Sequence, residues 1–230
     1  TEALDNRVPT EVQTEVYLQS RRLLDRAVRW LVTNRPSPID VPGEIARLNP
    51  VSRLLPELGN LFIGGERQTL ETDVARMVDL GLPRDVAERA VWLAYSFGLL
   101  DIVETATATG RDLHEVASVY YVLSERFRID ALLSKISMLP REDRWQTLAR
   151  MALRYDLYSA LAALTVEVLN STSESASAED RVDQWEQAHS VPITRTRSAI
   201  GEIDESRADL AALSVLLRQI RTLVRTASAG

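Results

Sequence analysis

Three features of this 230-residue sequence predict an all-helical fold. The stretch from about residue 141 to residue 170 contains no glycine or proline and reads as one long helix, roughly 45 Å at 1.5 Å per residue. Glycines and prolines elsewhere fall near the ends of apolar stretches with helical spacing. Runs of alternating β-branched residues are absent, so no strand or sheet is expected. We therefore predict a multi-helix bundle built around the long central helix.

The apolar residues of this long helix change sides along its length. Trp145, Ala149, Leu153 and Leu157 recur every four residues. Because four residues overshoot a 3.6-residue turn, the stripe winds around the helix. We expect the first half to face one neighbour. The second half should face another neighbour with a set of small and large apolar residues, namely Leu157, Ala160, Leu161, Leu164 and Val168.

Five residues are candidates for structural or interface roles. The aromatic residues Trp30, Trp145 and Tyr158 are expected to anchor the core or an interface. Asp156 lies near the winding apolar surface, and if it is buried it must be paired; an arginine on another helix is the expected partner. Arg26 belongs to an arginine-rich segment that we interpret as a solvated face, or as a surface that meets the carboxylates of a partner.

The first half of the chain is predicted to form several helices of different lengths. They span residues 10–33, 42–48, 50–58, 66–80, 83–97 and 99–108. Thr10 and Gln13 have the spacing of a capping box at the start of the first helix. The inward face of that helix is predicted to be its set of aliphatic side chains, namely Leu23, Leu24, Ala27, Val28 and Leu31. Gly81 and Gly110 follow apolar segments, at the position where a helix-ending glycine is expected.

The second half is predicted to contain helices at 112–127, 129–138, 141–170 and 178–188, and a last helix that begins at Ser206. In the last helix, apolar residues at steps of three and four form a short seam, which favours packing within the domain over a free coiled coil. We predict a main bundle over 1–170, with 1–9 a polar lead-in from an upstream catalytic domain. The serine-rich segment 171–178 is expected to be a flexible connector, and the helices of 179–230 are expected to pack back on the bundle.

Composition bounds the functions that this chain can have. It is 45% hydrophobic and 26% charged, the ordinary range for a globular protein. A net charge of −6 argues against a nucleic-acid or anionic-membrane partner, since both need basic patches. The chain has no cysteine, which excludes disulfides, thiolate metal sites and a cysteine nucleophile and fits a reducing, cytoplasmic location. No apolar run approaches a membrane span and no signal peptide is visible. The polar start without methionine suggests an excised fragment.

A search for catalytic motifs predicts no catalytic, cofactor-binding or metal-binding residue. The dinucleotide fingerprint, the P-loop and the nucleophile elbow are all absent. His114 and His189 lack metal-ligand spacing and are expected at the surface. The helical pair around Gly81 has the length of a helix-turn-helix unit, but Asp85 and Glu88 occupy the start of its second helix, so a plain helical hairpin is favoured. Carboxylate pairs on helices are interpreted as complements to the helix dipole.

Six stretches, spread over nearly the whole chain, resemble one family in the same order. They are ALDNRVP at 3–9, RRLLDRAVRWLVTNR at 21–35, IVE at 102–104, TGRDLHEVASVYYVLSERF at 109–127, DRWQTLARMALRYDLY at 143–158 and LSVLLRQIRTL at 213–223. Together they resemble the C-terminal helical region of the large bacterial NAD-specific glutamate dehydrogenases.

This resemblance implies a noncatalytic segment of an enzyme. In that family, glutamate is deaminated oxidatively to 2-oxoglutarate and ammonia with NAD as hydride acceptor, and a preceding α/β region carries the chemistry. Its nicotinamide-binding glycines and catalytic lysine have no counterpart here, since Lys135 is the sole lysine and lies outside any motif. The resemblance therefore implies no cofactor in this segment and NAD in the catalytic domain of the parent. It also implies two partners, the catalytic domain of the same chain and, in a homo-oligomer, further copies.

Two other functions remain open from the sequence. The chain could be a free-standing helical module for protein interaction. It could also be an independent enzyme or a small-molecule sensor, which would require a sizeable enclosed cavity lined by convergent polar groups.

Overall fold

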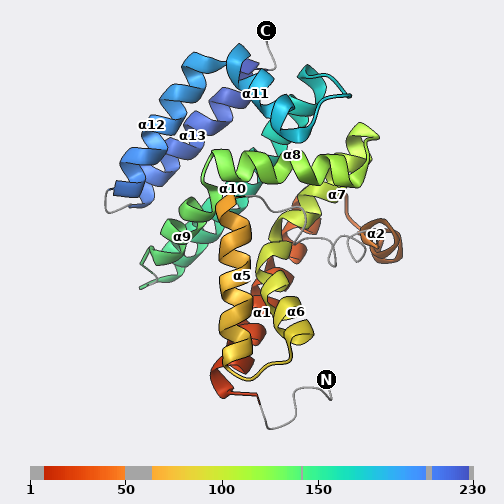
Figure 1. The fold of residues 1–230 in the computed structure, drawn as a ribbon, viewed down its shortest axis with the longest axis vertical. Helices are drawn as coiled ribbons and strands as arrows, with labels where there is room; N and C mark the ends of the chain where they lie inside the picture. The colour runs from red at the N-terminus through yellow and green to blue at the C-terminus, as the bar shows by residue number, and fades with distance from the viewer. Residues whose placement is uncertain (1–7, 50–63, 141, 206–208, 228–230) are drawn as a thin grey trace. The chain divides into compact units, whose positions relative to one another are not determined.

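The computed structural model describes residues 8–49, 64–140, 142–205 and 209–227, and throughout these ranges the regular structure is helical (Figure 1). The predicted all-α class is confirmed, and the described residues contain no strand. The chain divides into two compact units, residues 1–103 and residues 104–230. The predicted helix at 50–58 lies outside the described residues. None of the described helices is both long enough and apolar enough to span a membrane.

The first unit is a small helical cluster. Its described elements are α1 (Thr10–Asn34), α2 (Val41–Leu48), α5 (Gly64–Asp79), α6 (Arg84–Tyr95), the 3-10 turn η3 (Ser96–Gly98) and the first residues of α7 (Leu99–Thr109). Helix α6 packs against both α5 and α1, and α1 also contacts η3. The core of this unit is made of apolar side chains from all of these helices except α2, among them Val12, Trp30, Val74, Met77, Ala87, Val91 and Leu99.

The turn after α5 follows the predicted glycine signal. Gly81 has φ of 98°, and the Leu82 amide donates to the Met77 carbonyl at 3.2 Å. This pair of features is the Schellman ending of a helix, in which glycine avoids the steric penalty of the left-handed conformation. Gly110 ends α7 with φ of 67° in the same way. Both glycines therefore do what the sequence predicted.

The start of α1 differs from the predicted capping box. Pro9 is the N-cap residue and no side chain caps the helix, because Thr10 is already the first helical residue. The Gln13 amide group instead donates to the Val8 carbonyl at 2.8 Å. The predicted range of 10–33 is close to the observed helix, but the N-cap residue is Pro9 and not Thr10.

The buried face of α1 also differs from the prediction. The residues of α1 that are buried are Val12, Arg26 and Trp30. Leu24 and Val28, predicted to face inward, are both more than half exposed. The interpretation of Arg26 as solvated was wrong for a physical reason. A buried carboxylate from a distant part of this unit meets the guanidinium, and that contact cannot be seen in local periodicity.

The second unit is organised around the long helix. Its elements are α8 (Leu113–Arg126), α9 (Ile129–Met138), α10 (Arg144–Ser171), α11 (Ala178–Ala188), α12 (Ser190–Glu205) and α13 (Leu210–Ala227). Helix α10 contacts α8, α9, α11 and α13, so the predicted central helix is the hub of this unit (Figure 1). Helix α12 was not predicted as an element of its own, because Pro192 and Gly201 interrupt its apolar pattern.

The winding stripe of α10 is confirmed from Leu153 onward, since Leu153 is buried as well. Leu157, Leu161, Leu164 and Val168 are all buried. Trp145, predicted as the first residue of the stripe, is 76% exposed. It lies in the first turn of α10, two residues after the N-cap residue Asp143, and spacing alone cannot tell where neighbouring helices stop covering a helix end.

Helix α13 packs within its unit, as its short seam predicted. Leu213, Leu217 and Ile220 are buried, while Leu210 at the start of the seam is 41% exposed. The helix contacts α10 and α12. Asp209 caps the helix by accepting a hydrogen bond from the Ala212 amide at 2.8 Å, and the helix begins at Leu210.

Candidate functional site

A buried arginine cluster lies in the first unit. The Arg26 guanidinium pairs with the Asp101 carboxylate, and its Nε donates to the Phe97 carbonyl at 2.5 Å. Trp30 Nε1 donates to the second carboxylate oxygen of Asp101 at 3.1 Å. Both charged side chains are less than 10% exposed. The cluster therefore ties α1 to η3 and to the start of α7, and its groups are committed to one another rather than to a ligand.

A second cluster in this unit joins α1 to α2 around the same tryptophan. The guanidinium groups of Arg35 and Arg47 lie 4.7 and 5.1 Å from the centre of the Trp30 ring, a cation–π arrangement. Both arginines also bond Glu44, at 2.5 and 2.8 Å. The hydrogen bond from Arg47, followed by that from Arg35, lowers the pKa of Glu44 below its ordinary value despite an opposing effect of burial.

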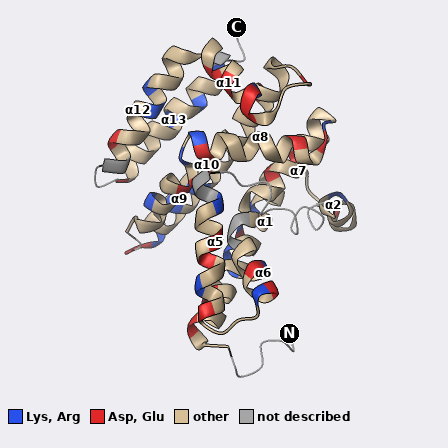
Figure 2. Cartoon of the chain, viewed as in Figure 1, with Lys and Arg blue, Asp and Glu red and all other residues tan. Residues whose placement is uncertain are grey.

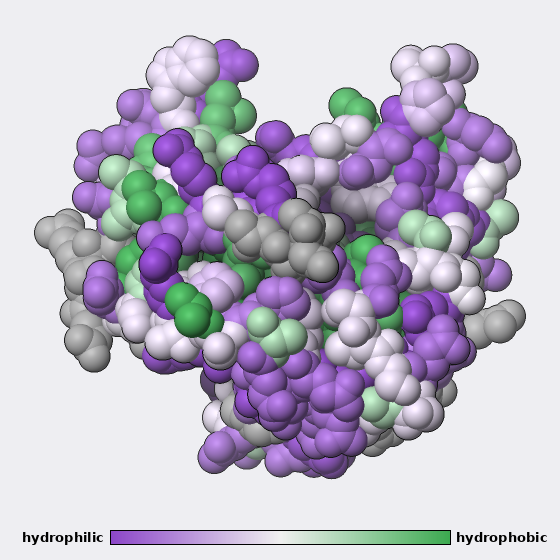
Figure 3. Space-filling view, turned by 90° about the horizontal axis from the view of Figure 1, so that it is seen from above, coloured by the Kyte–Doolittle hydropathy of each residue, from purple (hydrophilic) through white to green (hydrophobic). Residues whose placement is uncertain are grey.

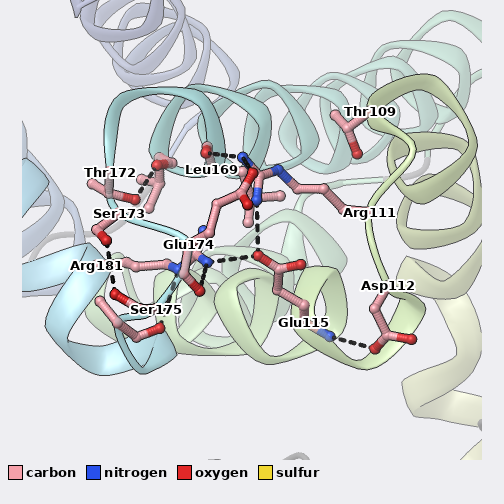
Figure 4. Close-up of polar contacts among 12 residues, drawn as sticks. Thr109, Arg111, Asp112, Glu115, Leu169, Thr172, Ser173, Glu174, Ser175 and Arg181 are labelled. Carbon is pink, nitrogen blue, oxygen red and sulfur yellow. Dashed lines mark hydrogen bonds and ion pairs between the residues drawn. The ribbon is translucent and has the colours of Figure 1, made fainter.

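In the second unit, two arginines hold the connector after α10 (Figure 4). Arg181 is 1% exposed and pairs with Glu115 at 2.7 Å. It also donates to the backbone carbonyls of Glu174 at 2.7 Å and Ala176 at 3.2 Å. Arg111 bonds Glu115 at 3.0 Å. These contacts attach the connector to α8 and α11, while the flexibility predicted for residues 171–178 stays a prediction.

Arg111 has a further structural task. Its Nη2 atom donates to the Leu169 carbonyl at 2.8 Å, in the last turn of α10 (Figure 4). The carbonyls of a last helical turn lack partners within the helix, and a cation there also complements the helix dipole. The sequence analysis singled out neither Arg111 nor Arg181. For Arg181 a signal existed, since it stands next to Val182 and four residues before Trp185, on the apolar side of α11.

The second unit has an open groove between α10 and α13, with a volume of about 660 Å³. Small residues line its α10 side, namely Ser159, Ala160 and Ala163. Three arginines line its α13 side, namely Arg218, Arg221 and Arg225. Figure 2 marks the positions of Lys and Arg along the helices in blue. Helix α13 has no acidic residue, so this groove is basic in a chain whose net charge is −6.

Asp156 supplies the one carboxylate of this groove. It is one-third exposed and pairs with Arg221 at 2.6 Å. An arginine on another helix is the kind of partner that the sequence predicted for it. The other predicted candidates, Tyr158 and Trp145, are buried and exposed respectively, and neither lines the groove.

The two histidines differ in their surroundings. His114 is exposed, as predicted. His189 is half-buried, with its ring 5.3 Å from the ring of Trp185 and Nδ1 2.9 Å from the Trp185 carbonyl. Among the residues that the structure describes, no group of three or more acidic or histidine side chains could hold a metal ion.

The chain was compared with known protein families. A family model described as "Glutamate dehydrogenase, C-terminal" matches residues 1–222. The chain belongs to this glutamate dehydrogenase C-terminal family. The resemblance found in the six sequence stretches is thereby confirmed.

Curated relatives of the family match along nearly the whole chain. An NAD-specific glutamate dehydrogenase of Mycobacterium tuberculosis is 38% identical over 225 residues, 97% of this chain. Proteins with the same name from Pseudomonas aeruginosa and Halomonas elongata are 31% and 27% identical, over 100% and 99% of this chain. In each case the chain spans 14% of the length of the relative. The glutamate dehydrogenase C-terminal region is thus a small part of those polypeptides.

Proposed function

We propose that this chain is the noncatalytic C-terminal helical domain of a large NAD-specific glutamate dehydrogenase. The observation that carries the proposal is the match of residues 1–222 to the family, together with relatives that are seven times longer and bear that enzyme's name. The parent reaction is the conversion of L-glutamate, NAD and water to 2-oxoglutarate, ammonia and NADH. NAD and the reacting groups belong to the catalytic domain of the parent, which is cytoplasmic.

The role proposed for the domain is to pack against the catalytic domain of the same chain and so support assembly of a homo-oligomer. An exposed apolar stripe on α1 suits this role. It consists of large side chains that are each between 51% and 67% exposed, namely Tyr17, Leu24, Val28 and Val32. Steps of seven, four and four residues place them on one face of the helix.

Burial of this stripe would be favourable. Each large aliphatic or aromatic side chain contributes roughly 1.5–3 kcal/mol when it passes from full exposure to full burial. Since these four are already partly covered, roughly half of that amount remains available for each. Hydrophilic residues predominate on the face shown in Figure 3, and hydrophobic residues form small separate patches there. The α1 stripe, in which four large apolar side chains are aligned, is therefore a better candidate for a packing surface than these small patches.

The test uses the full-length enzyme in three forms. The first lacks residues 1–230, the second carries Leu24→Asp and Val28→Asp, and the third carries the control changes Arg22→Ala and Thr33→Asp. The control changes the net charge by the same amount, −2, at exposed positions of α1 outside the stripe. We expect the deletion and the stripe variant to change the assembly state, measured by light scattering, and to reduce glutamate-dependent NADH formation. The control should behave like the wild type.

Two results would contradict the proposal. A deletion that leaves activity, assembly and effector response unchanged would remove any role of the domain in the enzyme. Equal behaviour of the stripe and control variants would assign the packing role to a different surface.

A further inference from the structure

The groove between α10 and α13 holds positive charge that the described residues of the domain do not neutralise. Arg221 is paired with Asp156, but the Arg218 guanidinium has no hydrogen bond or ion pair with any residue in the described ranges. The Arg225 guanidinium makes a single described contact, a 3.3 Å hydrogen bond to the Thr222 hydroxyl, which carries no charge. Both arginines are exposed. Two guanidinium groups are therefore available to an acidic partner.

The spacing of the arginines indicates the shape of that partner. Arg218, Arg221 and Arg225 lie at steps of three and four residues, so they form one row along α13. Seven residues of helix extend the row over about 10 Å. Carboxylates at the same steps on a second helix would follow the same row. A compact anion such as phosphate could meet only one or two of these groups at a time.

The opposite wall of the groove favours a helix as well. Ser159, Ala160 and Ala163 have short side chains, and Ser214 on the α13 wall is short too. Short side chains let helix backbones approach toward the lower end of the usual 8–10 Å separation. Buried Leu217 adds an apolar floor between the arginine row and the small residues. An amphipathic helix with an apolar seam beside a row of carboxylates would fit both walls.

We propose that this groove binds an acidic amphipathic helix from another part of the same parent polypeptide. This inference rests on the proposed function, because it requires a longer chain around the domain. The relatives are long enough to supply such a segment, since the domain spans 14% of their length. A tethered helix has a millimolar effective concentration near its site, so a groove of modest affinity is filled from within the chain first.

The experiment places a photoreactive amino acid in the full-length enzyme. One form carries it at Ser214, inside the groove, and the control form carries it at Val215, which is exposed on α13 but does not line the groove. After irradiation, a denaturing gel separates links within one polypeptide from links between two. Mass spectrometry then identifies the linked peptide. We expect the Ser214 form to link within one polypeptide to an acidic segment outside residues 1–230, and the Val215 form not to do so.

A second set of variants tests whether the Ser214 cross-link depends on the charge of the arginines. In the double variant Arg218→Glu and Arg225→Glu, the yield of the Ser214 link should fall at least about tenfold, because like charges would face each other. The matched variant Arg218→Lys and Arg225→Lys keeps the charge and should keep the link. Both positions are exposed, so neither variant should disturb folding.

Several outcomes would overturn the inference. These are no link from Ser214, a link to a second polypeptide, a link to a segment that is not acidic, or a link that survives the charge reversal. Deletion of residues 1–230 tests the proposed function independently of the link. If the deletion alters assembly but the Ser214 form does not link, the proposed function is supported and this inference is refuted.

Discussion

Replacement of Arg26 by methionine tests how the first unit is held together. Methionine keeps much of the volume of the side chain but removes the charge, so the buried Asp101 carboxylate loses its guanidinium partner. Loss of one partner of a buried ion pair costs about 3–5 kcal/mol. The Phe97 carbonyl also loses a donor, which is already contained in that range. For a chain of this length, the same loss corresponds to a fall of roughly 6–20 °C in Tm.

Urea unfolding of residues 1–230, followed by far-ultraviolet circular dichroism, measures this cost. A double-mutant cycle with Asp101→Asn isolates the pair, and we expect the double variant to lose about 2 kcal/mol less than the sum of the single variants. Arg22→Met, at an exposed position of the same helix, is the control and should stay within about 0.5 kcal/mol of the wild type. An Arg26→Met cost below about 1 kcal/mol, or strict additivity in the cycle, would refute the reasoning.

Two further predictions concern the other charged clusters. Hydrogen bonds from Arg47 and Arg35 lower the pKa of Glu44 in the folded protein. The ionised carboxylate therefore stabilises the fold fully at pH values above about 4.3, the pKa of glutamate in an unfolded chain. This stabilisation is lost as the pH falls through the lower pKa of the folded state. Glu44→Gln should therefore be less stable than the wild type at neutral pH, with a difference in urea midpoint that shrinks between about pH 5 and pH 3; a constant difference would contradict this. Arg181→Met should cost about 3 kcal/mol or more and should speed amide exchange in the connector, whereas unchanged exchange would show that the connector does not depend on this side chain.

Local signals were enough to predict most of the helices. Asp112 and Asp143 cap α8 and α10 with their side chains. Such caps can be predicted from sequence because the capping side chain bonds a backbone amide only two or three residues away. Gly81 and Gly110 mark helix ends because few other residues adopt positive φ. The all-α class and the central position of α10 in its unit follow from these signals together with apolar spacing.

The partners of the buried arginines could not be predicted from spacing. Arg26 and Asp101 are 75 residues apart in the chain, and their contact exists only once the first unit is folded. Arg181 and Glu115 are likewise brought together by the packing of α11 on α8. Asp156 is different: an arginine of another helix was predicted as its partner in the case that it is buried, and Arg221 of α13 is that partner although Asp156 is one-third exposed.

The failed prediction for α1 is informative about function. Leu24 and Val28 have the spacing of a buried face, yet the first unit packs the other side of the helix inward and leaves them exposed. An apolar stripe that the described helices of its own unit do not cover has the properties of a surface completed by another domain.

The α1 stripe is apolar and the α13 arginine row is charged, so salt should affect the contacts made by the two surfaces differently. Contact through the stripe would depend on buried apolar area, which salt does not weaken. Contact through the arginine row would depend on charges at the protein surface, which are screened within about 10 Å at 0.1 M salt. If both surfaces meet other parts of the parent enzyme, added salt should release the helix from the α10–α13 groove while the α1 contact persists. The two units of the domain would then respond to ionic strength independently, as their separate cores allow.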